Sequence, residues 1–205
     1  LTDQWFVDTA QIVQPALDAV RNGETKIMPE SCEKVYYHWL DNIEPWCISR
    51  QLWWGHQIPV WYGPADSEFP NSESDAPRTS DVSSNFKLFC GASEAEVLEQ
   101  MKAHYPDDYD IRLHDGETLF AGLEKNSETG KRTIVVSRDP DVLDTWFSSG
   151  LWPFGTLGWP AEDEAMKYFP GDVLITGQDI LFFWVARMMM MSNAVLDENP
   201  FHTIY

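Results

Sequence analysis

The chain has 205 residues, enough to bury the core of one large domain or of two small ones. Its formal net charge is −19, from 33 Asp and Glu residues against 14 Lys and Arg residues. Phosphate contacts depend on Lys and Arg, so this charge counts against a broad nucleic-acid-binding surface, and an acidic, well-solvated surface is the simpler interpretation.

The three cysteines, Cys32, Cys47 and Cys90, are odd in number and too far apart for a Cys-x-x-Cys metal motif. This pattern is typical of a reduced, cytoplasmic protein. We expect no signal peptide, no apolar run of transmembrane length and no membrane partner. Because residue 1 is Leu1 and Tyr205 falls inside a predicted strand, we expect a fragment of a longer protein.

The first predicted helix covers residues 8–22, where apolar residues recur at helical spacing before Gly23. Pro15 is expected to kink this helix or to mark a later start. Short strands are predicted on either side, at 4–7 and 26–28. A second helix opens at residues 29–31, and its expected inner face consists of Val35, Tyr36, Trp39 and Leu40.

An aromatic segment follows at 46–62, with the sequence WCISRQLWWGHQIPVWY. Core packing explains its aromatic residues and His56 as well as a functional role does. Arg50 is the strongest functional candidate, because a guanidinium can hold a phosphate or a carboxylate through two hydrogen bonds.

Residues 63–85 are rich in Pro, Ser, Asp and Asn, which predicts a flexible loop. The next residues predict a small α+β insert, in which Ser93 and Glu96 form a capping box at the start of a helix. Its expected elements are a strand at 86–89, a helix at 93–104, a strand at 111–113, a turn at 115–116 and a strand at 133–136. With one cysteine, and with His104 and His114 interpreted as surface residues, the insert cannot bind zinc, and we assign no metal ligand.

The segment 172–191, DVLITGQDILFFWVARMMMM, predicts a strand at 173–176, a glycine at 177 and then a helix. Residues 202–205 begin another strand. Such a strand–helix–strand unit belongs to a parallel sheet, whose ligands bind outside the carboxyl ends of the strands, here at Gly177. The helix is expected to be buried on more than one side through Ile180, Leu181, Trp184, Val185, Met188 and Met189.

Four segments, in this order along the chain, resemble the valyl-tRNA synthetases, which are class I aminoacyl-tRNA synthetases. They are WCISRQLWWGHQIPVWY at 46–62, DVLDTWFSS at 141–149, LWPFGTLGWP at 151–160 and TGQDILFFWVARM at 176–188.

The resemblance implies an α/β fold, namely part of the Rossmann-like class I synthetase nucleotide-binding fold, a parallel βαβ unit with a small α+β insert. Residues 1–62 would return the chain from an editing insertion into the catalytic domain. Residues 63–138 would form the connective insert, with its flexible loop at 63–85. Residues 139–205 would form the second half of the catalytic domain.

The resemblance also implies an activity. The full-length enzyme would activate valine with ATP, accompanied by Mg²⁺, and transfer it to tRNA(Val). The HIGH and KMSKS signatures, which supply the phosphate contacts in this family, do not occur in the chain. We therefore assign no catalytic residue, expect the chain to be inactive alone, and expect it to contribute little nucleic-acid binding.

By resemblance, Gly177 and Asp179 belong to the ATP site. A glycine lets adenosine approach the backbone, and the carboxylate can accept hydrogen bonds from the ribose hydroxyls. The alternative for Asp179 is a carboxylate favoured by the helix dipole. Arg50, Trp53 and Trp54 are candidates for contacts at the catalytic face or with the tRNA end.

Trp146, Ile180 and Trp184 resemble the valine pocket of the family, and the last two are four residues apart and so share a helical face. For these three the alternative is ordinary core, which is the preferred interpretation for Trp152 and Trp159.

Two other functions stay open. The isoleucyl and leucyl enzymes share part of the pattern, although the runs TWFSS at 145–149 and FFWVARM at 182–188 favour valine. A non-catalytic interaction module on a synthetase scaffold is the alternative from another class.

Overall fold

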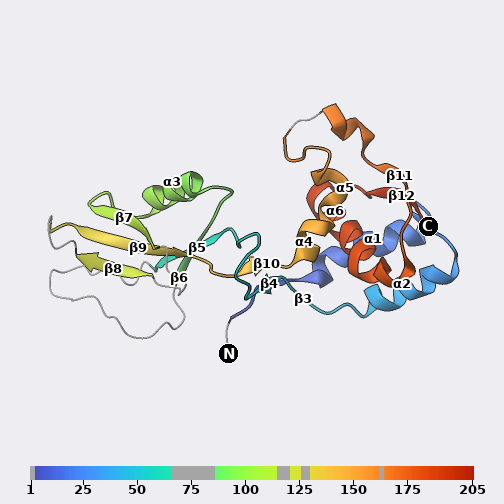
Figure 1. Cartoon of the computed structure of the whole chain (residues 1–205), viewed down its shortest axis with the longest axis horizontal. Helices are drawn as coiled ribbons and strands as arrows, with labels where there is room; N and C mark the ends of the chain where they lie inside the picture. The colour runs from blue at the N-terminus through green and yellow to red at the C-terminus, as the bar shows by residue number, and fades with distance from the viewer. Residues whose placement is uncertain (1–2, 66–85, 115–120, 126–129, 162–163) are drawn as a thin grey trace. The chain divides into compact units, whose positions relative to one another are not determined.

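The computed structural model describes residues 3–65, 86–114, 121–125, 130–161 and 164–205 (Figure 1). The chain forms two compact units. The first combines Leu1–Arg50 with Leu143–Tyr205, and the second is Gln51–Val142. The insert expected at 63–138 thus lies within a wider unit, which also takes in residues 51–62 and 139–142.

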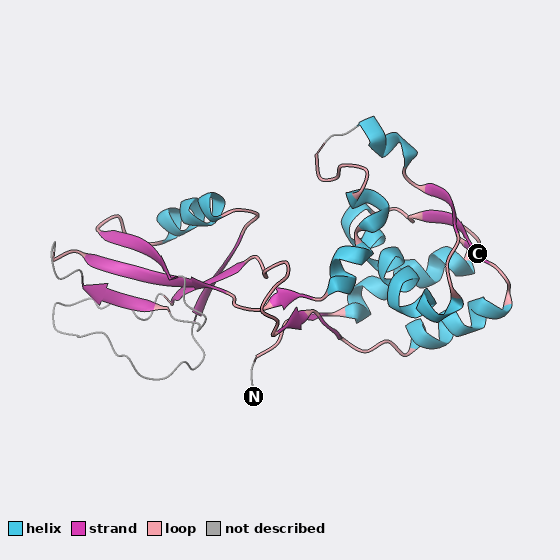
Figure 2. Ribbon diagram, in the orientation of Figure 1, coloured by secondary structure: helices cyan, strands magenta, loops and turns pink. Residues whose placement is uncertain are grey.

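A parallel sheet of three strands, in the order β11-β12-β2, organises the first unit. β11 (Gly171–Leu174) pairs with β12 (Phe201–Ile204), and β12 pairs with β2 (Lys26–Ile27). The chain between β11 and β12 is helical, so the predicted parallel strand–helix–strand unit is confirmed (Figure 2). Because the strands are parallel, their carboxyl ends lie at one edge of the sheet.

The crossover helix between these strands changes its winding twice. It begins as a 3₁₀ turn, η3 (Gln178–Ile180), continues as a π-helix, η4 (Leu181–Ala186), and becomes α-helical in α6 (Arg187–Leu196). The expected continuous α-helical spacing is therefore wrong over its first turns. Leu181 and most residues from 185 to 191 are buried, as predicted, whereas Ile180 and Trp184 are only partly buried.

Helices α1 (Thr9–Arg21) and α2 (Ser31–Asp41) form the rest of this core, packed with the crossover helix. α1 runs through Pro15, so this proline does not mark a later start. The buried side of α2 consists of Cys32, Tyr36 and Leu40, which are four residues apart and so form one stripe. Val35 and Trp39, expected inside, are 46% and 47% exposed because they flank that stripe.

The segment Gln178–Leu196 is apolar and long enough to cross a membrane, contrary to the expectation that no apolar run reaches that length. Within it, 44% of the most apolar window is buried inside the protein. Core helices of folded domains meet the same criteria of length and composition, so this single segment is weak evidence for a membrane span.

The remaining elements of the first unit are short, and β10 begins at Val142, the last residue of the second unit. β1 pairs antiparallel with β3, β4 pairs with β10, and α4 and α5 both contact α6. Their bounds are β1 (Phe6–Val7), β3 (Trp46–Cys47), β4 (Ser49–Arg50), β10 (Val142–Leu143), α4 (Thr145–Gly150), α5 (Trp152–Gly155) and a 3₁₀ helix, η2 (Glu164–Tyr168).

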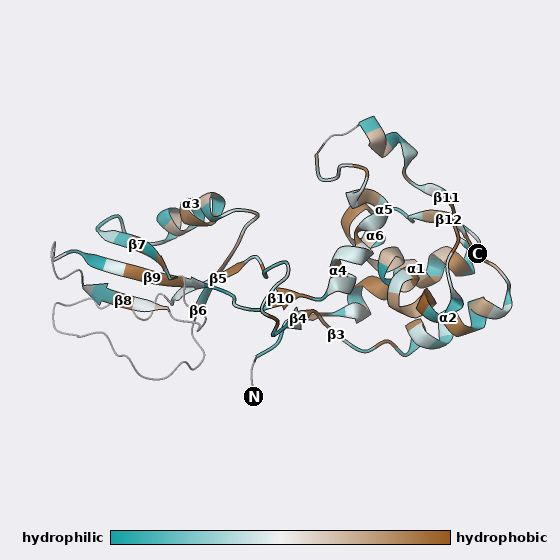
Figure 3. Ribbon diagram, viewed as in Figure 1, coloured by the Kyte–Doolittle hydropathy of each residue, from teal (hydrophilic) through white to brown (hydrophobic). Residues whose placement is uncertain are grey.

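In the second unit the described residues form a sheet in the order β6-β5-β9-β7, with β8 also paired to β9, and one helix, α3 (Glu94–His104). β9 carries a hydrophobic middle and a hydrophilic start (Figure 3), and its residues Ile134 and Val136 join Trp61, Val97 and Met101 in the core. The strand bounds are β5 (Val60–Pro64), β6 (Phe86–Cys90), β7 (Tyr109–His114), β8 (Gly122–Lys125) and β9 (Arg132–Arg138).

Local signals in this unit have mixed outcomes. The Ser93 cap is confirmed, because the backbone N–H of Glu96 donates to Ser93 Oγ over 3.3 Å, although the Glu96 carboxylate accepts from Ala92 N rather than from Ser93 N. The loop predicted from residue 63 is wrong for Gly63 and Pro64, which belong to β5. The rest of that loop, 66–85, and the turn at 115–116 lie outside the described residues.

Candidate functional site

The carboxyl edge of the parallel sheet is the first part of the candidate site. Thr176 N donates to Tyr205 O over 2.9 Å, and Tyr205 N donates to Leu174 O over 2.7 Å. The segments that follow β11 and β12 therefore remain hydrogen-bonded to each other as far as the residue before Gly177. A hollow of about 10 Å³, room for roughly one water molecule, lies at this edge, at the position where the sequence predicted a ligand. It is lined by Ile27, Met28, Cys32, Thr176, Gly177, Gln178, Leu181, Ile204 and Tyr205.

Gly177 and Asp179 lie at the start of the crossover helix and are both exposed. A Cβ added to Gly177 would collide with Oδ1 of Asp179, so the carboxylate is folded back against the glycine. Asp179 lies in the first helical turn, where the helix dipole favours a negative charge. The structure therefore places an accessible acceptor beside the hollow at Gly177.

The three residues predicted for a valine pocket lie on neighbouring elements. Trp146 belongs to α4, Trp184 belongs to η4, and these two helices contact each other. Ile180 immediately precedes η4 and is partly buried.

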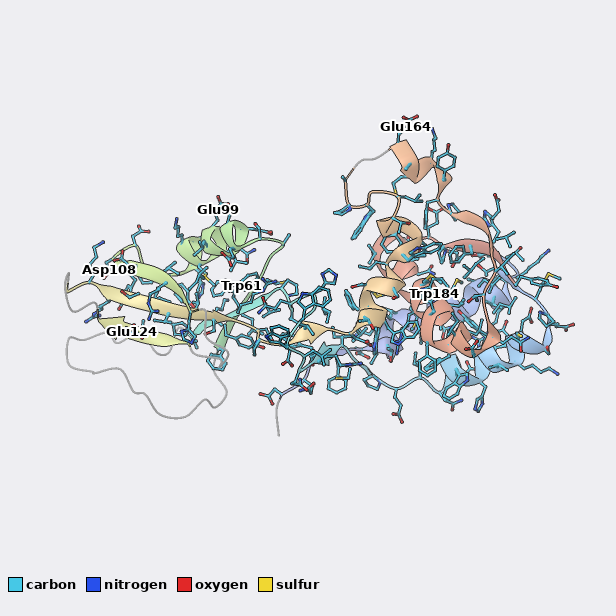
Figure 4. The ribbon with its side chains drawn as sticks, viewed as in Figure 1. Trp61, Glu99, Asp108, Glu124, Glu164 and Trp184 are labelled. Carbon is cyan, nitrogen blue, oxygen red and sulfur yellow. The ribbon has the colours of Figure 1, made fainter. Side chains whose placement is uncertain are left out.

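The rings of the two tryptophans have different neighbours. Trp146 stacks on Phe183 with a centroid distance of 6.1 Å and an angle of 28°. Trp184, labelled in Figure 4, donates from Nε1 to Ser149 O over 3.1 Å and lies 5.7 Å from the ring of Trp152. Trp152 is 45% exposed, so its interpretation as ordinary core is wrong, whereas Trp159 is partly buried against Phe154.

Arg50 has internal partners in this structure. Its Nη1 donates to Cys47 O over 2.9 Å and to Ser49 O over 2.8 Å. Its Nη2 lies 3.0 Å from Oδ2 of Asp144. A bound phosphate or carboxylate would have to compete with these acceptors for the guanidinium.

Asp144 is a buried centre of contacts that the sequence did not single out. It is 5% exposed, and its Oδ2 also accepts from Trp46 Nε1 over 2.9 Å. Its Oδ1 accepts from Trp146 N over 3.2 Å, which caps the N-terminus of α4. An Asp two residues before Trp146 is an N-cap signal, so this part of its role could have been found from the sequence.

Arg187 is the other residue that sequence reasoning missed. Its Nη1 lies 3.9 Å from Oδ2 of Asp144, and its guanidinium lies over the ring of Trp46 at 4.3 Å. Burial lowers the pKa of Arg187, while the Asp144 carboxylate opposes this shift and Arg50 adds to it. Arg187 is the single cation between residues 172 and 191, which is a signal that could have marked it.

Trp53 and Trp54 belong to the second unit and are 98% and 85% exposed. His56 is exposed as well. Core packing, one of the two interpretations of this segment, is therefore wrong for these three side chains.

Across the part of the chain that the structure describes, no three His, Cys, Asp or Glu side chains come together as a group that could hold a metal ion. The described cysteines Cys32, Cys47 and Cys90 are free.

Comparison with known proteins covers the whole chain. Residues 1–205 match the family model of the class I tRNA synthetases (I, L, M and V). A valine–tRNA ligase of Ruegeria pomeroyi is 56% identical over 213 residues, which cover 100% of this chain and 20% of that protein.

Two further valine–tRNA ligases also align with the full chain. The ligase of Cereibacter sphaeroides is 50% identical, and the alignment covers 24% of its length. The ligase of Nitrobacter winogradskyi is 47% identical, and the alignment covers 19% of its length. The chain thus spans between 19% and 24% of the length of these relatives.

Proposed function

Because the chain belongs to the class I tRNA synthetases (I, L, M and V), we propose that it is the part of a valine–tRNA ligase that holds adenosine and valine. In the proposed reaction the carboxylate of valine attacks the α-phosphorus of ATP, pyrophosphate leaves, and the valyl group then passes from the adenylate to tRNA(Val). Positioning and charge stabilisation provide most of the catalysis in such a reaction.

The place of Gly177 at the carboxyl edge of the parallel sheet is the observation that carries this proposal. Open α/β sheets bind their ligands at the carboxyl ends of parallel strands. Gly177 lets the adenosine approach the backbone, and the exposed carboxylate of Asp179 accepts from the ribose hydroxyls.

Trp146, Ile180 and Trp184 form the proposed wall of the valine site. The contact between α4 and η4 and the partial burial of all three side chains support this assignment. Valine is preferred to isoleucine or leucine as the substrate because the relatives reported above are named as valine–tRNA ligases. Arg50, Trp53 and Trp54 are proposed to contact the catalytic face or the tRNA end, and the exposure of both tryptophans supports this.

Other parts of the full-length ligase would complete the site. Neither a HIGH nor a KMSKS signature occurs in the 205 residues, so the phosphates of ATP and their Mg²⁺ would be bound elsewhere. The net charge of −19 supports a minor role for this chain in binding tRNA. Three free cysteines support a cytoplasmic location.

Pyrophosphate exchange tests the proposal. The full-length protein should catalyse valine-dependent exchange between pyrophosphate and ATP, with isoleucine and leucine as much poorer substrates. The 205-residue chain alone should stay at background. Exchange that depends on isoleucine or leucine, or no exchange at all by the full-length protein, would exclude the valine assignment, and exchange by the isolated chain would show that the missing signatures are not required.

A further inference from the structure

A charged cluster centred on the buried carboxylate of Asp144 contacts residues of the proposed valine wall. Asp144 accepts hydrogen bonds from Trp46 Nε1 and from the backbone N–H of Trp146, and it forms an ion pair with Arg50. Arg187 approaches the same carboxylate oxygen as Arg50, with 3.9 Å between Nη1 and Oδ2.

Three aromatic rings lie close to the guanidinium of Arg187. The centroid distances from its guanidinium carbon are 4.3 Å to Trp46, 5.7 Å to Trp146 and 5.9 Å to Phe183. Its side chain is 13% exposed, and its buried Nη1 has no hydrogen-bond partner in the structure. A buried guanidinium with an unfilled N–H is costly on its own, so its place between the rings depends on the charge of Asp144.

The same carboxylate fixes both tryptophans of the proposed wall. Asp144 caps α4, which begins one residue before Trp146. The same short helix contains Ser149, whose carbonyl accepts from Trp184 Nε1 over 3.1 Å. A shift of α4 would therefore move the ring of Trp146 and the anchor of Trp184 together.

We propose that Arg187, held by Asp144, is a positioning residue for amino-acid selection, which fixes the ring of Trp146 and, through α4, the ring of Trp184. Neither charged residue needs to touch the substrate. This inference rests on the proposed function, since it takes Trp146 and Trp184 to line the valine site. It adds that the shape of that site depends on the ion pair between Asp144 and Arg187.

Two substitutions test this in the full-length protein. Asp144→Asn keeps the size of the side chain and an acceptor for the cap, but removes the charge that holds Arg187. Arg187→Lys keeps the positive charge, but removes the planar group that lies on the rings. The matched control is Asp41→Asn, which removes the carboxylate of the exposed Arg21–Asp41 pair, where the atoms are 2.8 Å apart.

The expected result is a rise of about three- to thirty-fold in the KM for valine in both variants, the range for losing a partly buried contact between a cation and a ring. The KM for ATP should stay within about two-fold, and the preference for valine over isoleucine in kcat/KM should fall. Asp41→Asn should change none of these values.

The outcomes separate this inference from the function on which it rests. An active wild-type protein whose two variants keep the KM for valine and the preference unchanged would overturn the positioning role and leave the function intact. Equal rises for valine and ATP would also overturn it, because a merely structural role predicts them. If Asp144→Asn fails to give a cooperative thermal transition, Arg187→Lys decides alone. A wild-type protein without valine-dependent exchange would remove both proposals.

Discussion

The carboxylate of Asp179 lies against the α-carbon of Gly177, so close that a Cβ at residue 177 would collide with Oδ1. The backbone of Gly177 has φ −73° and ψ 145°, a conformation open to any residue. Space for the Asp179 side chain, and not backbone freedom, is therefore what this structure requires of the glycine.

Gly177→Ala in the full-length protein should weaken ATP binding with little loss of stability. Leaving out the two neighbouring residues, the added methyl group meets only the side chain of Asp179 within 4 Å. Asp179 can therefore turn away while the helix stays in place. We expect the KM for ATP to rise by about three- to ten-fold, the loss of roughly one hydrogen bond. Pyrophosphate exchange at varied ATP measures it. A drop in the melting temperature by about 5 °C or more would show instead that the backbone has moved.

Asp179→Ala should raise the KM for ATP by about ten-fold or more, because a hydrogen bond to a charged group is worth roughly 1.5–3 kcal/mol. The KM for valine should stay nearly unchanged. Asp179→Asn keeps one acceptor oxygen, so its KM for ATP should fall between those of Asp179→Ala and the wild type. An equal rise for both substrates would indicate a general structural role.

The double variant Gly177→Ala, Asp179→Ala tests whether the glycine acts through the carboxylate. If it does, the methyl group has nothing left to displace, and the double variant should bind ATP no more weakly than Asp179→Ala alone. If the losses in ATP affinity of the two single variants instead add up in the double variant, Gly177 contacts the nucleotide independently of Asp179.

Tyr36 should make stability fall at alkaline pH. Its side chain is 1% exposed, its hydroxyl donates to Ala16 O over 3.0 Å, and burial, with a smaller contribution from Tyr37, raises its pKa far above the ordinary value of 10.0. Below pH 10.0 the hydroxyl is protonated in both states. Above it only the unfolded state releases the proton, so this contribution to stability is present below that pH and is lost as the pH rises.

Tyr36→Phe should therefore cost about 0.5–1.5 kcal/mol near neutral pH, through the lost hydrogen bond, and should remove part of the alkaline slope, which is at most about 1.4 kcal/mol per pH unit. Urea unfolding at several pH values up to about 11 measures both effects. The control is Tyr168→Phe, since Tyr168 is 68% exposed. Parallel curves for wild type and Tyr36→Phe above pH 10.0 would contradict the argument.

The parallel strand–helix–strand unit could be predicted because its signals are local. An apolar strand, a glycine and an apolar helix follow one another between residues 171 and 204, and the burial of Met188 and Met189 follows from their spacing. The π-helical turns from Leu181 to Ala186 could not be predicted, because an extra residue per turn leaves no mark in a run that is apolar on every side.

The charged cluster around Asp144 was missed for a different reason. Arg50 and Asp144 are 94 positions apart, and the spacing of neither residue shows that they meet at 3.0 Å. Arg50 was consequently interpreted as available to a phosphate, although its guanidinium has three acceptors within the chain. The exposure of Trp39 and Trp152 was missed because large aromatic residues are usually mostly buried.

Ile180→Ala tests the valine assignment itself. Ile180 ends the 3₁₀ turn that follows Gly177 and is partly exposed, whereas Trp184 packs on the core of the first unit. If Ile180 limits the size of the amino-acid site, trimming it to Ala should admit isoleucine. Because one methylene is worth about 1–3 kcal/mol in such a pocket, the preference for valine over isoleucine in kcat/KM should fall by about ten-fold or more.

The rival account treats Ile180 as part of the core. It predicts a loss of stability of about 2–5 kcal/mol and a similar fall in activity toward both amino acids, with their ratio unchanged. The partial exposure of Ile180 argues against a loss of that size. Adenylate formation with each amino acid, measured beside a thermal melt of the same variant, separates the two accounts. Val185→Ala, at a residue that is 0% exposed in the same helix, gives the core behaviour for comparison: it should lower the melting temperature and leave the ratio as it is. An Ile180→Ala variant that behaves like Val185→Ala would remove Ile180 from the site.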